Sequence, residues 1–398
     1  MQVTPDQTVV VLGKAIPPDD VALIVNDVEW RGWSDVRITR GIERVPNDFE
    51  VQVTELYPGA DSGPVQIDIA PGQRCEVWIG SQRVITGYVD RYSPAITRGA
   101  HTVTISGRGA CQDLVDCAAQ WPNQQISSAS VLDVAQKLAE PYGVPVRGVT
   151  GPAVGIQGSL IPIINLMLGE TAWEVIERLC RIAGILAFEQ PDGSLLLADN
   201  PADPLTGAAA TGLRSAASGF TEVVNVQAAR ATLSADQRYS EYRIYWYAYA
   251  PTQDIITEPK NRIATVQDVE ARPGRLKILV AETGNALSEQ IAKRRVTWEL
   301  ARRWGRSQMV TITTDSWFDS AGKLYEPNTV ARLNLPSLKI TGADKDWMIS
   351  QVTYHKNDAG TTCDLVLMPP AAFSVQPALP PYVIPQDVAQ AAAAARAQ

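Results

Sequence analysis

The sequence predicts a mainly β protein in which two similar β regions are separated by a smaller mixed α/β module. Three observations predict this class. Short runs of alternating apolar and polar residues, bounded by turn residues, occupy about residues 21–108 and return after residue 220. Between them, apolar residues recur three and four positions apart, as in amphipathic helices. The 398 residues are 45% hydrophobic and 20% charged, a composition typical of globular proteins with more than one domain.

Five alternating runs predict the strands of the first β region. They are residues 35–39, 49–53, 75–79, 84–89 and 101–105. Each run places apolar or β-branched side chains on one face, and Gly80-Ser81 between two of them is typical of a short hairpin. Because no helical spacing interrupts the series, these strands indicate a barrel or a sandwich, and we assign residues 1–109 to this domain.

Residues 110–212 are expected to form the mixed α/β module. Helical spacing predicts two helices, of which the second ends at Pro141. A capping box formed by Thr171 and Glu174 predicts the start of a third helix, and Gly184 its end. The two spaced helices are expected at residues 110–119 and 131–140, and a β-hairpin is expected at residues 185–198.

The second β region is expected to comprise residues 213–249 and 307–370, with residues 250–306 as an inserted segment. Its strands are predicted at residues 221–228, 241–249, 310–313, 330–335, 348–355 and 362–368. The insertion carries a predicted helix from about residue 286 to residue 306. Residues 371–398 are rich in Pro and then Ala, and we expect this tail to fray.

Two short similarities suggest that the β regions arose by duplication. Gly-Trp-Ser-Asp-Val at residues 32–36 matches Gly-Phe-Thr-Glu-Val at residues 219–223 in the pattern glycine, aromatic, hydroxyl, acid, valine. The closing segments also correspond, with residues 84–92 and 101–107 on one side and residues 348–354 and 362–368 on the other. The identities are few, so a chance similarity is the alternative.

The chain offers few residues for catalysis or metal binding. Its two histidines, His101 and His355, exclude a His-rich zinc site, and the five cysteines include no C-x-x-C pair. Neither a phosphate-binding loop nor a complete dinucleotide fingerprint is present. We therefore expect no catalytic residue, no cofactor and no metal site.

One basic cluster stands out in a chain of net charge −8. It consists of Lys293, Arg294, Arg295, Arg302, Arg303 and Arg306, all on the predicted helix of the insertion. An apolar stripe of Leu287, Ile291, Trp298 and Ala301 anchors this helix, so we expect the cations to point outward, toward a neighbouring subunit or an acidic partner. The alternative is a solvated helix face. Nucleic-acid binding is disfavoured because the acidic chain supplies no further phosphate contacts.

The aromatic residues also suggest an interface. Ten Trp and twelve Tyr accompany only five Phe, and Trp and Tyr suit surfaces that are apolar with a polar rim. The predicted strand at residues 241–249 carries too many aromatic side chains to bury on one face. We expect a core contact on one face and a domain or subunit contact on the other.

Several short stretches then connect the chain to a known family. They include Gly-Trp-Ser-Asp-Val-Arg-Ile-Thr-Arg-Gly-Ile-Glu at residues 32–43, Thr-Gly-Tyr-Val-Asp at 86–90, Asp-Leu-Val-Asp-Cys-Ala-Ala at 113–119, Pro-Tyr-Gly-Val at 141–144, Tyr-Ser-Glu-Tyr at 239–242 and Leu-Tyr-Glu-Pro-Asn at 324–328. In this order, over about residues 30–368, they resemble the baseplate hub proteins of Mu-like contractile-tail bacteriophages. The first twenty or so residues and the Ala-rich tail do not take part in the resemblance.

The resemblance implies a structural protein without a catalytic residue. It implies a homotrimeric ring at the centre of the baseplate, similar to the hub of the T-even phages, with two β-barrel domains in each subunit. Six barrels would let the ring join a threefold spike to the sixfold tail tube, and DNA would pass through its channel without specific binding. The implied location is the tail baseplate of the virion, after assembly in the host cytoplasm and without membrane insertion.

Three alternatives stay open at this point. One is a tail-tip enzyme that degrades the cell wall. Another is the hub-like part of a type VI secretion spike, although no Gly-rich repeat of the kind usual in those spikes follows Met368. The third is a phage-derived bacteriocin particle, which would use the same hub.

Overall fold

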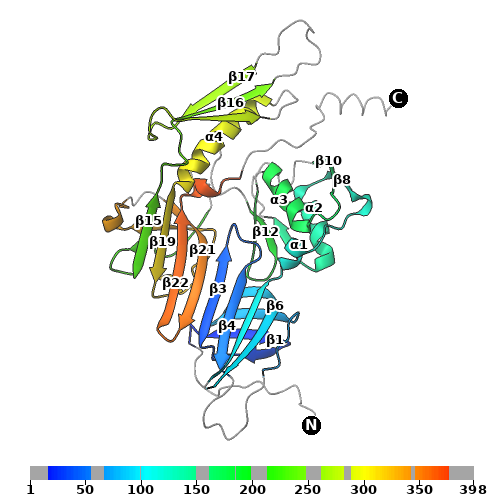
Figure 1. Cartoon of the computed structure of the whole chain (residues 1–398), viewed down its shortest axis with the longest axis vertical. Coiled ribbons are helices and arrows are strands. Elements are labelled where there is room, and N and C mark those ends of the chain that lie inside the picture. The colour runs from blue at the N-terminus through cyan, green and yellow to red at the C-terminus, as the bar shows by residue number, and fades with distance from the viewer. Residues whose placement is uncertain are drawn as a thin grey trace.

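A large sheet forms the body of the computed structural model, which describes residues 17–54, 67–98, 100–148, 161–183, 185–198, 213–247, 261–281, 288–341 and 346–375. The sheet has 14 strands, and its main path runs β15-β19-β22-β21-β3-β4-β7-β6-β5-β1-β2. β20 pairs with β21, and β13 and β14 pair with β20. Figure 1 shows that the two β regions lie side by side in this sheet. They are joined where β21 pairs with β3.

The first β region contains seven strands among the described residues. They are β1 (Val21–Val25), β2 (Val28–Trp30), β3 (Asp35–Gly41), β4 (Asp48–Thr54), β5 (Arg74–Ile79), β6 (Gln82–Thr97) and β7 (Ala100–Gly109). The alternation in β5 buries Cys75, Val77 and Ile79 on one face. Gly80, with φ of +55°, turns the chain into β6, which confirms the predicted hairpin.

The α/β module has its own apolar core, separate from that of the large sheet. Its elements are α1 (Gln112–Asp116), β8 (Gln125–Ala129), α2 (Val131–Ala139), β9 (Val146–Gly148), β10 (Ile161–Asn165), α3 (Ala172–Ala183), β11 (Leu186–Glu189) and β12 (Leu195–Ala198). The capping box that begins α3 is confirmed. The Thr171 hydroxyl accepts the Glu174 N–H at 3.2 Å, and the Glu174 carboxylate accepts the Thr171 N–H at 2.8 Å.

The second β region and its insertion form two separate sheets. β13 (Arg214–Ser215), β14 (Phe220–Thr221), β15 (Ala228–Leu233), β19 (Gln308–Thr314), β20 (Thr329–Asn334), β21 (Asp346–Asn357) and β22 (Gly360–Met368) belong to the large sheet. β16 (Glu241–Tyr247), β17 (Asn261–Gln267) and β18 (Leu276–Ala281) form a small sheet, beside which lies α4 (Ser288–Arg306). A short 3₁₀ helix, η4 (Pro370–Phe373), follows β22.

Two expectations about strands are wrong. Residues 221–228 are not a strand, because Asn225 closes a turn: its side chain accepts the Thr221 N–H and donates to the Gly219 carbonyl, both at 2.8 Å. The strand expected at residues 241–249 does not join the second β region. As β16 it pairs with β17 and β18, and one of its faces packs on α4.

The two β regions repeat one strand order. β3-β4-β7-β6-β5 in the first corresponds to β15-β19-β22-β21-β20 in the second. Asp90 interrupts the β6–β7 register and Ser350 the β21–β22 register, at the same distance from the hairpin tip. The similarity of the closing hairpins therefore has a structural counterpart. The Gly-aromatic motifs do not correspond, since one precedes β3 and the other lies at β14.

Neither region closes into a barrel among the described strands, so the expectation of two closed barrels is corrected to two modules of one open sheet. Apolar residues of both modules share one core cluster, from Val21 in β1 to Leu367 in β22. β21 explains why the sheet continues, because its second half pairs with β22 of its own module on one side and with β3 of the first region on the other. Residues 1–16, 199–212, 248–260, 282–287 and 376–398 lie outside the described residues, and with them Tyr249, Leu287 and most of the Ala-rich tail.

Candidate assembly site

Three of the six cations predicted as a contact patch turn inward. Arg302 donates to the Ser374 carbonyl at 2.8 Å and Arg306 to the Ala372 carbonyl at 2.9 Å. Arg303 pairs with Glu299 of the same helix at 2.6 Å. For these three, our expectation of outward-pointing cations is wrong. Arg302 and Arg306 bind the segment after β22, on which the end of α4 packs, whereas Arg303 binds Glu299 and, at 2.9 Å, the side chain of Gln237.

The other three cations lie nearer the start of α4. Lys293 and Arg294 are exposed, and Arg295 is half-buried with its guanidinium 5.5 Å from the centre of the Trp298 ring. Trp298 and Ala301 are buried as expected, whereas the side chain of Ile291 lies outside the described part of the structure. The contact patch is therefore reduced to the first half of the helix, where it remains a prediction.

Glu43 pairs with two of the three inward cations. It lies in the loop between β3 and β4, and its carboxylate pairs with Arg306 and, at 3.4 Å, with Arg302. Burial lowers the pKa of Arg302, and the neighbouring Arg306 lowers it further, but Glu43 opposes both effects. One carboxylate thus ties the insertion to the first β region across more than 250 residues of sequence.

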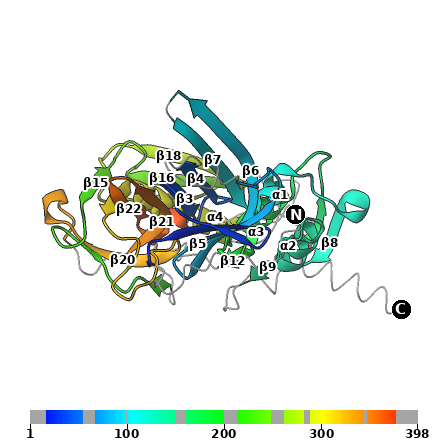
Figure 2. The ribbon, with the colours of Figure 1, turned by 90° about the horizontal axis from the view of Figure 1, so that it is seen from below.

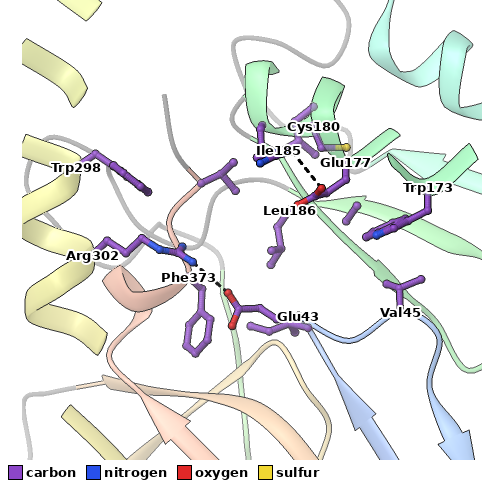
Figure 3. Close-up of a pocket in the computed structure, with 14 residues that line it drawn as sticks. Glu43, Val45, Trp173, Glu177, Cys180, Ile185, Leu186, Trp298, Arg302 and Phe373 are labelled. Carbon is purple, nitrogen blue, oxygen red and sulfur yellow. Dashed lines mark hydrogen bonds and ion pairs between the residues drawn. The ribbon is translucent and has the colours of Figure 1, made fainter. Parts of the chain in front are cut away.

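A cavity of about 420 Å³ lies beside this ion pair. Its lining comes from the β3–β4 loop, α3, β11, α4, and η4 with the segment that follows it, as Figure 3 shows. Arg302 and Glu43 point toward one another from opposite walls, with Phe373 and Leu186 beside them. The cavity therefore marks the joint at which the first β region, the α/β module and the insertion meet.

Glu189 forms a second joint and is 2% exposed. Its carboxylate accepts the N–H of Asn47 at 2.7 Å and the N–H of Cys111 at 2.8 Å. Burial raises the pKa of Glu189 to about 7, although both N–H donors and the charge of Arg40 act in the opposite direction. A β-carbon on Gly109 would lie 2.1 Å from this carboxylate, so the close approach requires glycine there. Glu189 thus fixes the α/β module to the first β region.

The small sheet leaves an apolar face uncovered in the described chain. Tyr242 and Ile244 of β16 are buried against α4, as one half of our expectation required. On the other face, Ile263 of β17 and Ile278 and Val280 of β18 are 52%, 54% and 78% exposed. The contact expected on this second face stays a prediction.

Cysteine and histidine side chains act in catalysis in many enzymes, but in this protein most of the described ones lie in the apolar core or on a strand surface. Cys75, Cys111, Cys180 and Cys363 are buried, and burial raises the pKa of each thiol, which disfavours the reactive thiolate. His355 lies 3.5 Å from Asp364 on a strand surface. Among the described residues, no three His, Cys, Asp or Glu side chains are grouped to hold a metal, and no helix is long and apolar enough to span a bilayer.

Sequence reasoning missed both Glu43 and Glu189. Glu43 lies in a loop, where acids are common, and its two arginine partners are known only once α4 is placed. Glu189 ends a predicted strand, and an acid at such a position normally faces solvent. A β-carbon on Gly109 would meet this carboxylate, but the sequence alone does not show which side chain fills that space.

Three family models match the chain in order. Residues 20–109 match the N-terminal domain of Mu phage baseplate assembly protein GpP-like proteins, and residues 111–199 match the second domain of baseplate hub protein gp44-like proteins. Residues 288–376 match the fourth domain of Mu phage baseplate assembly protein GpP. The chain is also 28% identical over 354 residues to baseplate hub protein gp44 of Escherichia phage Mu, which covers 86% of each protein.

Solved structures agree with this similarity. The 43 kDa tail protein of prophage MuSo2 from Shewanella oneidensis matches with a TM-score of 0.73 and 27% identity, over 89% of this chain and 99% of that one. A tail protein from Neisseria meningitidis MC58 has the same fold, with a TM-score of 0.67 and 20% identity over 89% of this chain and 97% of that one. The matches extend across the large sheet, the α/β module and the insertion.

Proposed function

Because this chain belongs to the baseplate hub proteins of Mu-like contractile-tail bacteriophages, we propose that it is the structural hub of a phage tail baseplate. Three copies form a ring that joins a threefold spike to the sixfold tail tube, and DNA passes through its centre. The hub acts by shape and contact, without a catalytic step. The ring is built in the host cytoplasm and functions in the virion tail.

The repeated strand order is the observation that best supports this role. Each chain carries two modules of the same order, β3-β4-β7-β6-β5 and β15-β19-β22-β21-β20. A trimer of such chains presents six similar modules, which fits a threefold object on one side and a sixfold object on the other. The shared core of the two modules holds them at a fixed mutual orientation, as an adaptor of two symmetries requires.

The alternative of a cell-wall-degrading enzyme has less support. A glycan hydrolase needs two carboxylates facing a cleft. At the cavity in Figure 3, Glu43 is occupied by two arginines and Glu177 pairs with Arg181 at 3.2 Å. The hub of a bacteriocin particle has the same structural role, and the genes next to this one distinguish it from a phage hub.

Light scattering tests the proposal. We expect a mass near three times 43.1 kDa at high protein concentration. A protein that stays monomeric at the concentrations used for crystallisation contradicts the ring. In parallel, incubation with purified peptidoglycan is expected to release no soluble fragments, and turnover would favour the enzyme.

A further inference from the structure

The cavity of about 420 Å³ beside the Glu43 ion pair, here called the joint cavity, has the size of a site for a small molecule. Such sites commonly measure roughly 300–1,000 Å³ and often lie where structural units meet. Figure 2 shows the second β region and the α/β module on opposite sides of the molecule. The joint cavity is lined from both, by α3 and β11 on one side and by α4 and η4 on the other. A molecule bound there would contact both parts at once.

The inner wall of the joint cavity is apolar. Leu186, Trp298 and Phe373 all line it and are at most 9% exposed. Trp173 and Ala187, which also line it, are half-buried. Two indole rings and one phenyl ring thus contribute to one cavity, and such a lining favours an apolar or aromatic occupant.

The charged side chains at the joint cavity carry an excess of positive charge. Arginines at positions 181, 302 and 306 are accompanied by two carboxylates, Glu43 and Glu177. Glu177 pairs with Arg181 at 3.2 Å, so Glu43 alone pairs with the other two guanidinium groups. Both contact its Oε1 atom, and Arg306 lies closer to it than Arg302, which is 3.4 Å away. Two cations therefore share one carboxylate oxygen.

Arg302 is the cation whose charge is incompletely compensated. Its guanidinium donates to the Ser374 carbonyl at 2.8 Å and lies 5.7 Å from the centre of the Trp298 ring, and both of these partners are uncharged. The charge of Glu299 also acts on Arg302, but that carboxylate pairs with Arg303 at 2.6 Å. Burial lowers the pKa of Arg302, as expected for a guanidinium that is withdrawn from water with too little negative charge around it.

We propose that the joint cavity binds a small apolar carboxylate, whose charged group pairs with Arg302 while its apolar body lies against Trp298 and Phe373. A guanidinium presents parallel N–H donors that match the two oxygens of a carboxylate. A second carboxylate also balances the charge that Glu43 leaves uncompensated. Every contact lies within one chain, so this inference does not depend on the proposed trimer. Because the ligand binds only the folded joint, it stabilises the docking of the α/β module on the insertion.

Three probes separate the contribution of the charge from that of the apolar body. They are phenylbutyrate, phenylbutanol, which has the same body without the charge, and acetate, which has the charge without the body. In calorimetric titrations of the full-length protein, we expect phenylbutyrate to bind with a Kd of about 1 mM or tighter. Phenylbutanol should bind about tenfold more weakly, and acetate should give no measurable heat. Absence of phenylbutyrate binding overturns the proposal, and equal binding of the acid and the alcohol overturns the part of Arg302.

Variants with opposite expected effects place the probe in the joint cavity. Arg302→Gln should weaken phenylbutyrate binding by at least about tenfold. Glu43→Gln should strengthen it about two- to fivefold, because the probe no longer competes with a carboxylate for Arg302. Ala187→Phe fills part of the cavity and should abolish binding. A general loosening of the joint would change the affinity in the same direction in Arg302→Gln and Glu43→Gln, so a decrease in both contradicts the assigned geometry.

Arg178→Gln is the matched control. Arg178 lies on α3, pairs with Glu170 at 2.5 Å and does not line the joint cavity. Its loss removes one positive charge without removing a contact, so the affinity for phenylbutyrate should stay within about twofold. A loss as large as that in Arg302→Gln would mean that the probe responds to overall charge, which overturns the site. Where Arg302→Gln fails to fold, the ratio between phenylbutyrate and phenylbutanol in the wild-type protein decides.

Discussion

At the scale of single residues, the carboxylate of Glu189 holds together segments that are far apart in the sequence. Its N–H donors come from the β3–β4 loop and from the start of α1, and Gly109 leaves the space that the carboxylate fills. The residue types were visible in the sequence, but the contact between Asn47 and Glu189 spans 142 positions and depends on how two modules dock. Local patterns carry no information on such a contact, which is why neither joint was predicted.

The raised pKa of Glu189 predicts a pH-dependent stability. The folded protein keeps the proton up to about pH 7, whereas the unfolded chain releases it near the ordinary value of 4.5. The stabilisation from this group is therefore present at low pH and is lost as the pH rises through about 7. Between pH ~5.5 and pH ~8 this loss amounts to about 2 kcal/mol. Glu189→Gln cannot ionise, so its melting temperature should fall less than that of the wild type over this interval.

The control for this prediction is Glu177→Gln. Glu177 lies on α3, where its side chain is 46% exposed, so its removal should leave the pH dependence of the melting temperature unchanged. An identical pH dependence in the wild type and in Glu189→Gln would show that Glu189 stays ionised in the folded protein.

At the scale of elements, local sequence signals predicted those helices and hairpins whose ends are fixed by nearby residues. The capping box of α3 and the Gly80 turn are examples, because the groups that make them lie within a few positions of one another. The wrong expectations concern segments whose structure depends on a side-chain hydrogen bond or on partner strands that the local sequence does not reveal. Asn225 converted an expected strand into a turn, and β16 found its partners in the insertion.

Gly305 provides a test of how closely α4 packs on η4. A β-carbon at this position would lie 2.4 Å from the backbone nitrogen of Ala372. Gly→Ala inside a helix usually stabilises by up to about 1 kcal/mol. Here we expect Gly305→Ala to destabilise by about 1–3 kcal/mol instead, because the helix and η4 must separate. Thermal unfolding shows whether Gly305→Ala lowers or raises the melting temperature.

Arg294→Ala on the exposed side of α4 is the matched control, and it should change stability by less than about 0.5 kcal/mol. If Gly305→Ala melts at or above the wild-type temperature, α4 and η4 are not in the close contact described here.

At the scale of the whole molecule, the sequence predicted the succession of β region, α/β module and β region, and the family resemblance agreed with it. The sequence did not predict that the two β regions share one sheet. Alternation with a period of two shows that a segment is a strand and which face is buried, but not which strand lies beside it. β21 has three neighbours along its length, and only the folded chain shows that one of them is β3.

The shared core predicts that the two β modules lose their structure together. Ile38 of β3 is fully buried and lies opposite Tyr354 of β21. Ile38→Ala should cost about 2–4 kcal/mol of unfolding free energy, and hydrogen exchange should speed up in β22 as well as in β4, although the substitution lies in the first module.

Leu179→Ala is the control, since it removes a comparable side chain from the separate core of the α/β module. Its effect on hydrogen exchange should concentrate on α2 and α3. Faster exchange confined to the first module in Ile38→Ala would mean that the modules are independent, and a hub made of independent modules could not hold six of them in a fixed ring.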